Sequence, residues 1–263
     1  MHKKHSGDTT ASKGNDLVKT TVFGISITNE KKNTILKYVT DSIEKTSEKY
    51  FIVTPNPEMV VYASRHAEFK NILNSAGIAL CDGMQLFRAA RFLGKPVQER
   101  ITGVSFMDSL CNAVSEKPIT VGFLGGRDGV AELTGECLAR RYPGLKVRFI
   151  SEEWDQNAKL IRNSQFVIRN SIDILFVAFG SPKQEEWMAK NISKLNIRVM
   201  MGVGGAFNEI AGREKSPPAW IDRSGFKWLW RLCHEPWRWK RQLALLNFVG
   251  MVLKAKIRRI YTF

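Results

Sequence analysis

Asp82 is the residue of this sequence best suited to act as a general base. It follows the apolar run IALC at 78–81 and precedes Gly83. A carboxylate at the end of a buried strand is partly removed from water, which favours proton transfer. The same place also suits a helix N-cap, for which aspartate is a preferred residue. The sequence therefore leaves both a catalytic and a capping role open for Asp82.

Four further polar residues are candidates for a substrate pocket. Thr54 and Asn56 follow the apolar run YFIV, and they suit either a pocket or the turn that TPNP favours. Arg100 lies in QERITG between two helical patterns, where its guanidinium either binds a phosphate through two N–H groups or lies in solvent. Gln184 lies in the first turn of a predicted helix, where its amide reaches a sugar hydroxyl or faces water.

Small and basic residues follow three other apolar runs of the sequence. They are Gly125 and Gly126, Gly180 and Lys183, and Gly204 and Gly205. Glycine allows backbone N–H groups to approach a diphosphate, and the N-terminus of a following helix adds partial positive charge. Tight turns alone would also account for each glycine. Ligands of open α/β sheets bind beyond the carboxyl ends of the strands, so we expect all these residues at one edge of a sheet.

Short β-branched runs alternate with helical patterns from about residue 20 onward. The predicted strands are TVFGISI, YFIVT, IALC, ITVGFL, KVRFI, IDILFVAF and IRVMMGV,. Residues 57–76 are predicted to form one helix, because their apolar residues share a face, Asn56 can cap the start and Gly77 follows the end,. Parallel strands need crossover helices, so the pattern predicts an α/β fold with a Rossmann-like, mostly parallel sheet covered on both faces.

The composition of the sequence changes along the chain and divides it into three parts. Residues 1–16 are polar and are expected to be a flexible tail,. Residues 17–212 carry the predicted α/β domain, and residues 213–263 form a helical, basic appendage with twelve lysines and arginines against three acidic residues. Its mixture of tryptophan, leucine and arginine suits an anionic membrane surface. A helix buried on its own domain or at an oligomer interface would also explain its apolar residues.

Composition restricts the possible functions. The 263 residues carry a net charge of +15, which indicates a polyanionic partner such as nucleic acid, anionic lipid or a phosphorylated substrate. The four cysteines are widely spaced, and neither a zinc-binding pattern nor an Asp-x-Asp pair occurs in the sequence,. We therefore expect no metal and no cofactor. The sequence contains neither an apolar run long enough to span a membrane nor a signal-peptide core, so a cytoplasmic protein is expected.

Seven ordered motifs resemble the WecG/TagA/CpsF family of bacterial glycosyltransferases. They are TPNPEMV, Asp82-Gly83, QERITG, GFLGG, FVAFGSPKQEEW, GVGGAF and the final SPPAW…GFKWLWRLCHEPWRWKRQ. The resemblance implies inverting, metal-independent transfer of a sugar from a UDP donor to a polyprenyl diphosphate-linked acceptor. It implies that N-acetylmannosamine, its uronic acid or a glucose-type sugar is transferred, and that the protein is peripheral on the inner face of the plasma membrane.

The resemblance also implies roles for individual residues. Asp82 would be the base, with Thr54 and Asn56 beside it. Arg100 would meet the diphosphate and Gln184 would contact substrate. Three arginines of the appendage would close over the active site, and these are Arg231, Arg238 and Arg241.

Two other functions are compatible with parts of the sequence. A dinucleotide-dependent oxidoreductase would explain the glycine-rich strand ends, but neither GFLGG nor GVGGAF matches G-x-G-x-x-G,. A nucleic-acid-binding protein would explain the charge and the clustered tryptophans. Because apolar residues crowd the basic appendage, we expect a membrane surface and not nucleic acid as the partner. The sequence also permits a homo-oligomer.

Overall fold

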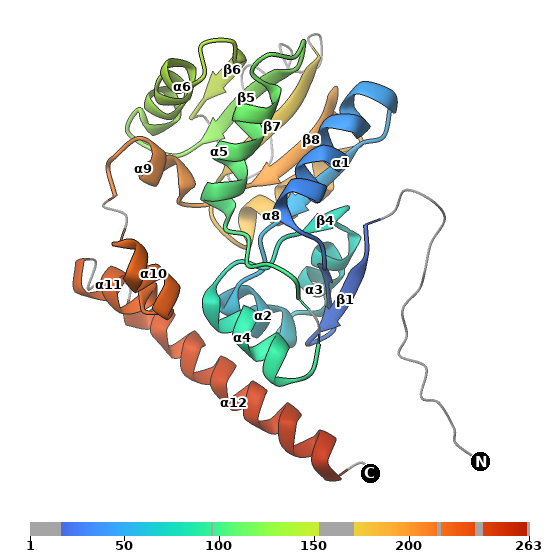
Figure 1. The fold of residues 1–263 in the computed structure, drawn as a ribbon, viewed down its shortest axis with the longest axis vertical. Helices are drawn as coiled ribbons and strands as arrows, with labels where there is room; N and C mark the ends of the chain where they lie inside the picture. Colours follow the sequence, from blue (N-terminus) through green and yellow to red (C-terminus); the bar gives the residue numbers. More distant parts are fainter. Residues whose placement is uncertain (1–16, 96, 153–170, 215–216, 235–238, 262–263) are drawn as a thin grey trace.

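The computed structural model describes residues 17–95, 97–152, 171–214, 217–234 and 239–261. Six strands of this part form one parallel sheet in the order β4-β3-β8-β7-β5-β6 (Figure 1). Their bounds are β3 (Tyr50–Val53), β4 (Ile78–Ala79), β5 (Thr120–Gly125), β6 (Lys146–Ser151), β7 (Ile172–Ala178) and β8 (Ile197–Gly202). The predicted α/β, Rossmann-like fold is confirmed.

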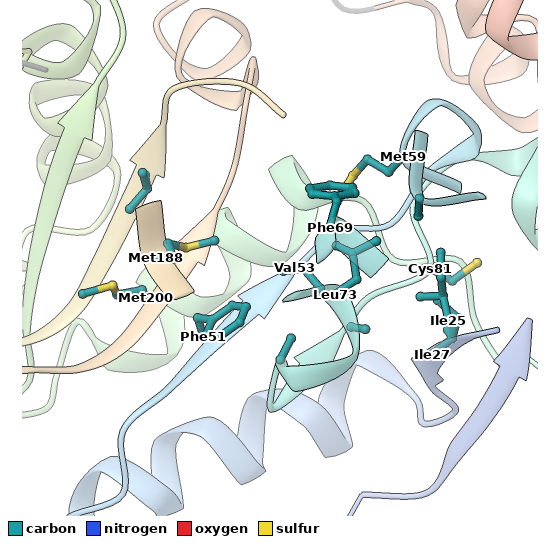
Figure 2. Packing of buried hydrophobic residues seen from close by; sticks show 14 of the residues in the cluster. Ile25, Ile27, Phe51, Val53, Met59, Phe69, Leu73, Cys81, Met188 and Met200 are labelled. Atoms are coloured by element: carbon teal, nitrogen blue, oxygen red, sulfur yellow. The ribbon is translucent and has the colours of Figure 1, made fainter. Parts of the chain in front are cut away.

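Helices cover both faces of this sheet and create two hydrophobic cores. The central strand β7 alternates between them, because Leu175 and Val177 pack into one core and Ile174 and Phe176 into the other,. The first core is covered by α2 (Pro57–Arg65), α3 (Ala67–Ser75), α4 (Met84–Phe92) and α8 (Lys183–Asn191), and Figure 2 shows its buried side chains. The second is covered by α1 (Lys32–Lys45), α5 (Gly103–Val114), α6 (Val130–Arg141) and α9 (Ala206–Ile210).

The sequence predicted that the run TVFGISI forms a single strand, and in the structure it does not. It divides into β1 (Lys19–Val22) and β2 (Ile25–Thr28), which pair antiparallel in a separate two-stranded sheet. Phe23 and Gly24 both have positive φ, at 53° and 75°, and two such residues make the tight turn that a hairpin needs. The prediction was wrong because the β-branched residues on the two sides of Phe23 and Gly24 were taken as one strand.

The segment 57–76 is two helices and not one. α2 ends at Arg65, His66 is extended with φ −128° and ψ 95°, and α3 begins at Ala67. The prediction of a single helix was wrong because both helices bury an apolar face against the same core, so the apolar pattern hides the break,. The predicted cap is confirmed, since Asn56 Oδ1 accepts a 3.0 Å hydrogen bond from Met59 N.

The described part of the appendage is helical, with α10 (Ala219–Ser224), α11 (Lys227–His234) and α12 (Trp239–Tyr261). α12 lies alongside α2 (Figure 1). Its Phe248 is 2% exposed and meets the Phe23 ring edge-on, with the ring centroids 5.6 Å apart. None of the described helices is long and apolar enough to cross a membrane. The appendage thus shares a core with the α/β domain through one face of α12.

Candidate active site

A cavity of about 1130 Å³ opens at the carboxyl ends of the parallel strands. Residues that follow all six strands of the sheet line it, among them Thr54, Asp82, Gly126, Gly180 and Gly204. Parallel strands bring their carboxyl ends to one edge of the sheet. Ligands of such sheets usually bind at this edge, at the topological switch point where the strand order reverses. The structure therefore brings together residues that are up to 150 positions apart in the sequence.

Asp82 is held by the backbone around it. Its N–H donates to Pro55 O over 3.0 Å, and its Oδ2 accepts from the N–H of Gly103 over 3.4 Å. Gly103 is the first residue of α5, so the carboxylate lies at the positive end of a helix dipole,. The N-cap of α4 is Gly83 and not Asp82. The capping role that the sequence left open is thereby excluded for α4.

Three of the other predicted pocket residues surround Asp82. Thr54 and Asn56 line the cavity with it, and Arg100 lines the same wall. Thr54 is 7% exposed, and a Cβ added to Gly103 would lie 3.4 Å from its methyl carbon. Asn56 also caps α2, so its side chain serves both the wall and the helix start. The predicted group of Asp82, Thr54, Asn56 and Arg100 is one spatial cluster.

The thiol of Cys81 illustrates the electrostatics of this cluster. Its pKa is raised to about 12, mainly by burial and also by the Asp82 carboxylate, while the Arg100 guanidinium acts in the opposite direction,. A thiol with so high a pKa stays protonated at neutral pH and is not a nucleophile. The thiol is thus not a candidate for the reacting group, and the carboxylate and the guanidinium beside it remain the predicted ones.

Gln184 lies in the cavity wall but is only 3% exposed. Its Oε1 accepts from the N–H groups of Gly180, over 3.2 Å, and Gly204, over 3.1 Å. Its Nε2 donates to Glu185 Oε1 over 2.8 Å. The alternative that this amide simply faces water is therefore wrong. Its predicted contact with substrate stays a prediction.

Several of the predicted glycines use their N–H groups within the protein. Gly126 N donates to Ala178 O over 3.1 Å, while the N–H groups of Gly180 and Gly204 are bonded to Gln184. Gly205 also lines the cavity. These bonds join neighbouring strand ends and shape the wall. Direct binding of a diphosphate by these glycines stays a prediction.

Some predicted residues do not reach this wall. Gly125 and Lys183 are not among the residues that line the cavity, and Lys183 is exposed at the start of α8. Arg238 lies outside the described residues, and the side chains of Arg231 and Arg241 are not described. Their predicted closure over the site therefore stays a prediction.

The appendage nevertheless contributes to the cavity. Gly225, Trp228 and Leu245 line it, next to Asp82 and its neighbours. Gln85 Nε2 in α4 donates to Gly225 O over 2.7 Å, so the turn between α10 and α11 is bonded to α4. The segment after residue 212 is thus part of the wall of the site, and side chains from both predicted parts of the chain meet there.

The structure also adds residues that the sequence analysis did not select. Arg127 and Arg213 line the cavity and add positive charge, and Asn208 and Glu185 belong to or support the same wall. Arg127 directly follows Gly126, so the rule of strand ends applied one residue further would have found it,. The burial of Glu185 has no signal in the sequence, because an acid in the first turn of a helix is ordinary.

The cavity is suited to group transfer with charge stabilisation. It joins a carboxylate at a helix N-terminus to several guanidinium groups that can meet a diphosphate,. Among the described residues, no group of three or more histidine, cysteine or acidic side chains could hold a metal ion. Three arginines of the lining, Arg100, Arg127 and Arg213, can meet an anionic substrate, and six acidic residues line the same cavity, namely Glu58, Asp82, Asp128, Glu152, Glu209 and Glu214.

Comparison with known proteins agrees with this arrangement. The model of the glycosyl transferase WecG/TagA/CpsF family matches residues 20–261. A Bacillus spizizenii protein named N-acetylglucosaminyldiphosphoundecaprenol N-acetyl-beta-D-mannosaminyltransferase is 31% identical over 204 residues, which cover 78% of this chain and 79% of that protein. A Staphylococcus aureus protein of the same name is 28% identical over 251 residues, covering 94% and 97%. The chain therefore belongs to the WecG/TagA/CpsF family of glycosyl transferases.

Proposed function

We propose that this enzyme transfers N-acetylmannosamine from a UDP donor to N-acetylglucosamine linked to a polyprenyl diphosphate. The names of its relatives supply the two sugars and the lipid. The observation that carries the proposal is the position of Asp82, a carboxylate in a cavity that also contains Arg100 and further arginines. A base beside positive charge is what a hydroxyl nucleophile and a diphosphate leaving group need.

The proposed reaction is a single inverting displacement. The acceptor hydroxyl forms a bond to the anomeric carbon of the donor sugar, its proton passes to Asp82, and the bond to the UDP oxygen breaks. The hydrogen bond from Gly103 holds the carboxylate in place. Arg100, Arg127 and Arg213 line the cavity and supply positive charge for the leaving diphosphate,.

We further propose that the enzyme works as a peripheral protein on an anionic membrane. An exposed apolar stripe runs along α12, opposite the face that buries Phe248. Its residues lie three or four positions apart and are Leu243, Leu246, Val249, Leu253 and Ile257. Basic residues lie on the same helix, which suits insertion of the apolar stripe among anionic headgroups,.

The test of the activity is a screen of UDP-sugars with a polyprenyl diphosphate-linked N-acetylglucosamine acceptor, read by UDP release and by mass of the lipid product. We expect UDP-N-acetylmannosamine to give product with the β-configuration. Product from another donor alone would correct the sugar, and no product from any donor would refute the proposed activity.

The test of the membrane proposal is sedimentation with vesicles that contain anionic lipid. Changing Leu246 and Leu253 to aspartate should abolish binding, because both side chains are more than half exposed on the stripe. Val18→Asp, an exposed residue outside the appendage, is the matched control. Wild-type binding to DNA that falls steeply with salt, without binding to vesicles, would favour the nucleic-acid partner instead.

A further inference from the structure

Gln184 ties together two loops that form the wall of the cavity. Its single amide oxygen accepts from Gly180, which follows β7, and from Gly204, which follows β8. Both loops line the cavity. A shift of one loop relative to the other would change the shape of the substrate site, so this amide sets part of its geometry.

The tie works in only one orientation of the amide. If the amide were turned over, its N–H groups would face the N–H groups of both glycines, and three donors would meet without an acceptor. Nε2 lies instead on the side of Gly202, where an added Cβ would come within 2.9 Å of it. The absence of a side chain at Gly202 therefore makes the space that the Gln184 amide occupies.

Glu185 supplies the acceptor that fixes this orientation. Its Oε1 lies 2.8 Å from Gln184 Nε2. An ionised carboxylate only accepts hydrogen bonds, and a protonated carboxyl still has a carbonyl oxygen that accepts, so in either state Glu185 favours the orientation in which Nε2 points toward it. The hydrogen bond to Glu185 therefore selects the orientation in which the Gln184 amide oxygen joins Gly180 to Gly204.

Stability alone does not account for a carboxylate at this place. Glu185 is 0% exposed, and its Oε2 has no hydrogen-bond partner among the described residues. Burial raises its pKa to about 7, although hydrogen bonds with Gln184 and Ser181 act in the opposite direction. A buried carboxylate with one unsatisfied oxygen is destabilising. Groups of this kind are concentrated at functional sites.

We propose that Glu185 is a positioning residue for sugar transfer, which fixes the Gln184 amide so that it joins the Gly180 and Gly204 loops in the wall of the active site. This role rests on the proposed function, because the loops matter only if the cavity binds the reacting substrates. Glu185 itself does not line the cavity, so it acts through Gln184 and not on the sugar.

The experiment combines three variants of the full-length chain with two readouts. Glu185→Leu removes the acceptor at similar volume, and Gln184→Glu places two carboxylates against each other. The double variant Q184E/E185Q swaps the carboxylate and the amide. The amide at position 185 then donates to the carboxylate at position 184, and that carboxylate also accepts from the N–H groups of Gly180 and Gly204. Glu186→Gln, on the neighbouring residue, is the matched control. The readouts are hydrogen exchange of the Gly180 and Gly204 amides, and kcat/KM for transfer, with Tm recorded for each protein.

We expect Glu185→Leu to keep or raise Tm while both glycine amides exchange at least about tenfold faster and kcat/KM falls roughly tenfold to hundredfold, as misplacement in a site does. Gln184→Glu should lose activity, and the exchanged pair should regain most of it together with amide protection. A merely structural role would instead lower Tm and would give no rescue on exchange of the pair.

Two results would overturn the proposal. The first is Glu185→Leu protein whose glycine amides exchange hydrogen at the wild-type rate and whose turnover is that of the wild type. The second is a Q184E/E185Q variant whose activity and amide protection are no higher than those of Gln184→Glu alone. Should the wild-type chain transfer no sugar to the acceptor, the proposed function fails, while the exchange of the two glycine amides still tests whether Glu185 holds the tie.

Discussion

The N–H of Gly103 donates to Oδ2 of Asp82 over 3.4 Å, across 21 positions of sequence. Because Gly103 opens α5, the contact places the carboxylate at a helix N-terminus, which carries partial positive charge,. A carboxylate that lines the cavity can accept the proton of an acceptor hydroxyl,.

Replacing this carboxylate should separate catalysis from binding. We expect Asp82→Asn to bind the UDP-sugar normally and to lower turnover by roughly 10² to 10⁴, the range typical of a lost general base. Calorimetry with UDP and single-turnover transfer measure the two effects. Asp41→Asn, which changes a surface ion pair with Lys45, is the control and should behave as wild type,. Near-normal turnover of Asp82→Asn would remove this residue from the mechanism.

Transfer should not require a divalent metal. The sequence has no Asp-x-Asp pair to hold one against a nucleotide diphosphate,, and arginines line the cavity in its place. We expect full activity in EDTA, measured as UDP release after removal of metal from all reagents. Activity that disappears on chelation and returns with Mg²⁺ or Mn²⁺ would contradict this.

The buried carboxylate of Glu185 should make stability depend on pH. Its folded-state pKa of about 7 lies above the ordinary value of 4.5, so its contribution is full below about 4.5 and is lost as pH rises through 7,. Glu185→Gln cannot ionise. We therefore expect Tm of the variant minus Tm of the wild type to increase from pH 5 to pH 8, by about 2–4 °C for each kcal/mol of ionisation cost.

The control for this pH series is Glu136→Gln, an exposed residue of α6 that is not among the groups acting on Glu185. Its Tm difference from the wild type should change with pH much less than that of Glu185→Gln. A Glu185→Gln difference that is equally flat would mean that Glu185 is ionised at little cost in the folded protein. The slope with pH is the decisive quantity, because the amide also changes a hydrogen bond at every pH.

Two residues of α12 should differ sharply in their effect on stability. Phe248 is 2% exposed and packs against Phe23, whereas Leu246 is 70% exposed. Phe248→Ala should lower the free energy of unfolding by about 3 kcal/mol, as for other buried aromatic residues, and Leu246→Ala by less than about 0.5 kcal/mol. Denaturant unfolding measures both. Equal effects would mean that α12 is not anchored to the first core.

The arginines of the appendage should affect transfer and not membrane attachment. Arg231→Ala or Arg241→Ala should lower turnover, because the diphosphate would lose charge compensation in the transition state. One charge among many changes adsorption to anionic vesicles little. Vesicle sedimentation and UDP release on the same preparations test this, with the exposed Arg140 of α6 changed to alanine as the control. Loss of vesicle binding in Arg231→Ala would mean that this arginine serves membrane attachment as well as transfer.

Local patterns of the sequence determined the class of the fold and the side of the sheet that carries the site. β-branched runs such as IDILFVAF are buried on both faces, which is the pattern of a central parallel strand,. Asn56 followed by Pro57 fixed the start of α2 through a cap that depends on adjacent residues alone,. The strand-end rule then selected Thr54, Asp82 and Gly204, because it depends only on where each strand ends.

The same local patterns failed where a change of backbone direction left no mark on hydrophobicity. Phe23 and Gly24 turn the chain back on itself between two β-branched segments, and His66 separates two helices that pack against the same core. In both places the apolar pattern reports which side is buried, and it reports nothing of the positive φ or the extended residue that divides the element.

Only the tertiary structure decided the contacts between distant residues. The amide of Gly103 meets Asp82 because α5 begins beside the end of β4. The amide of Gln184 spans the loops after β7 and β8, and Glu185 is fully buried against it although the sequence gives it no special character. Burial and hydrogen-bond partners depend on how separate elements pack, so no pattern within one element can specify them.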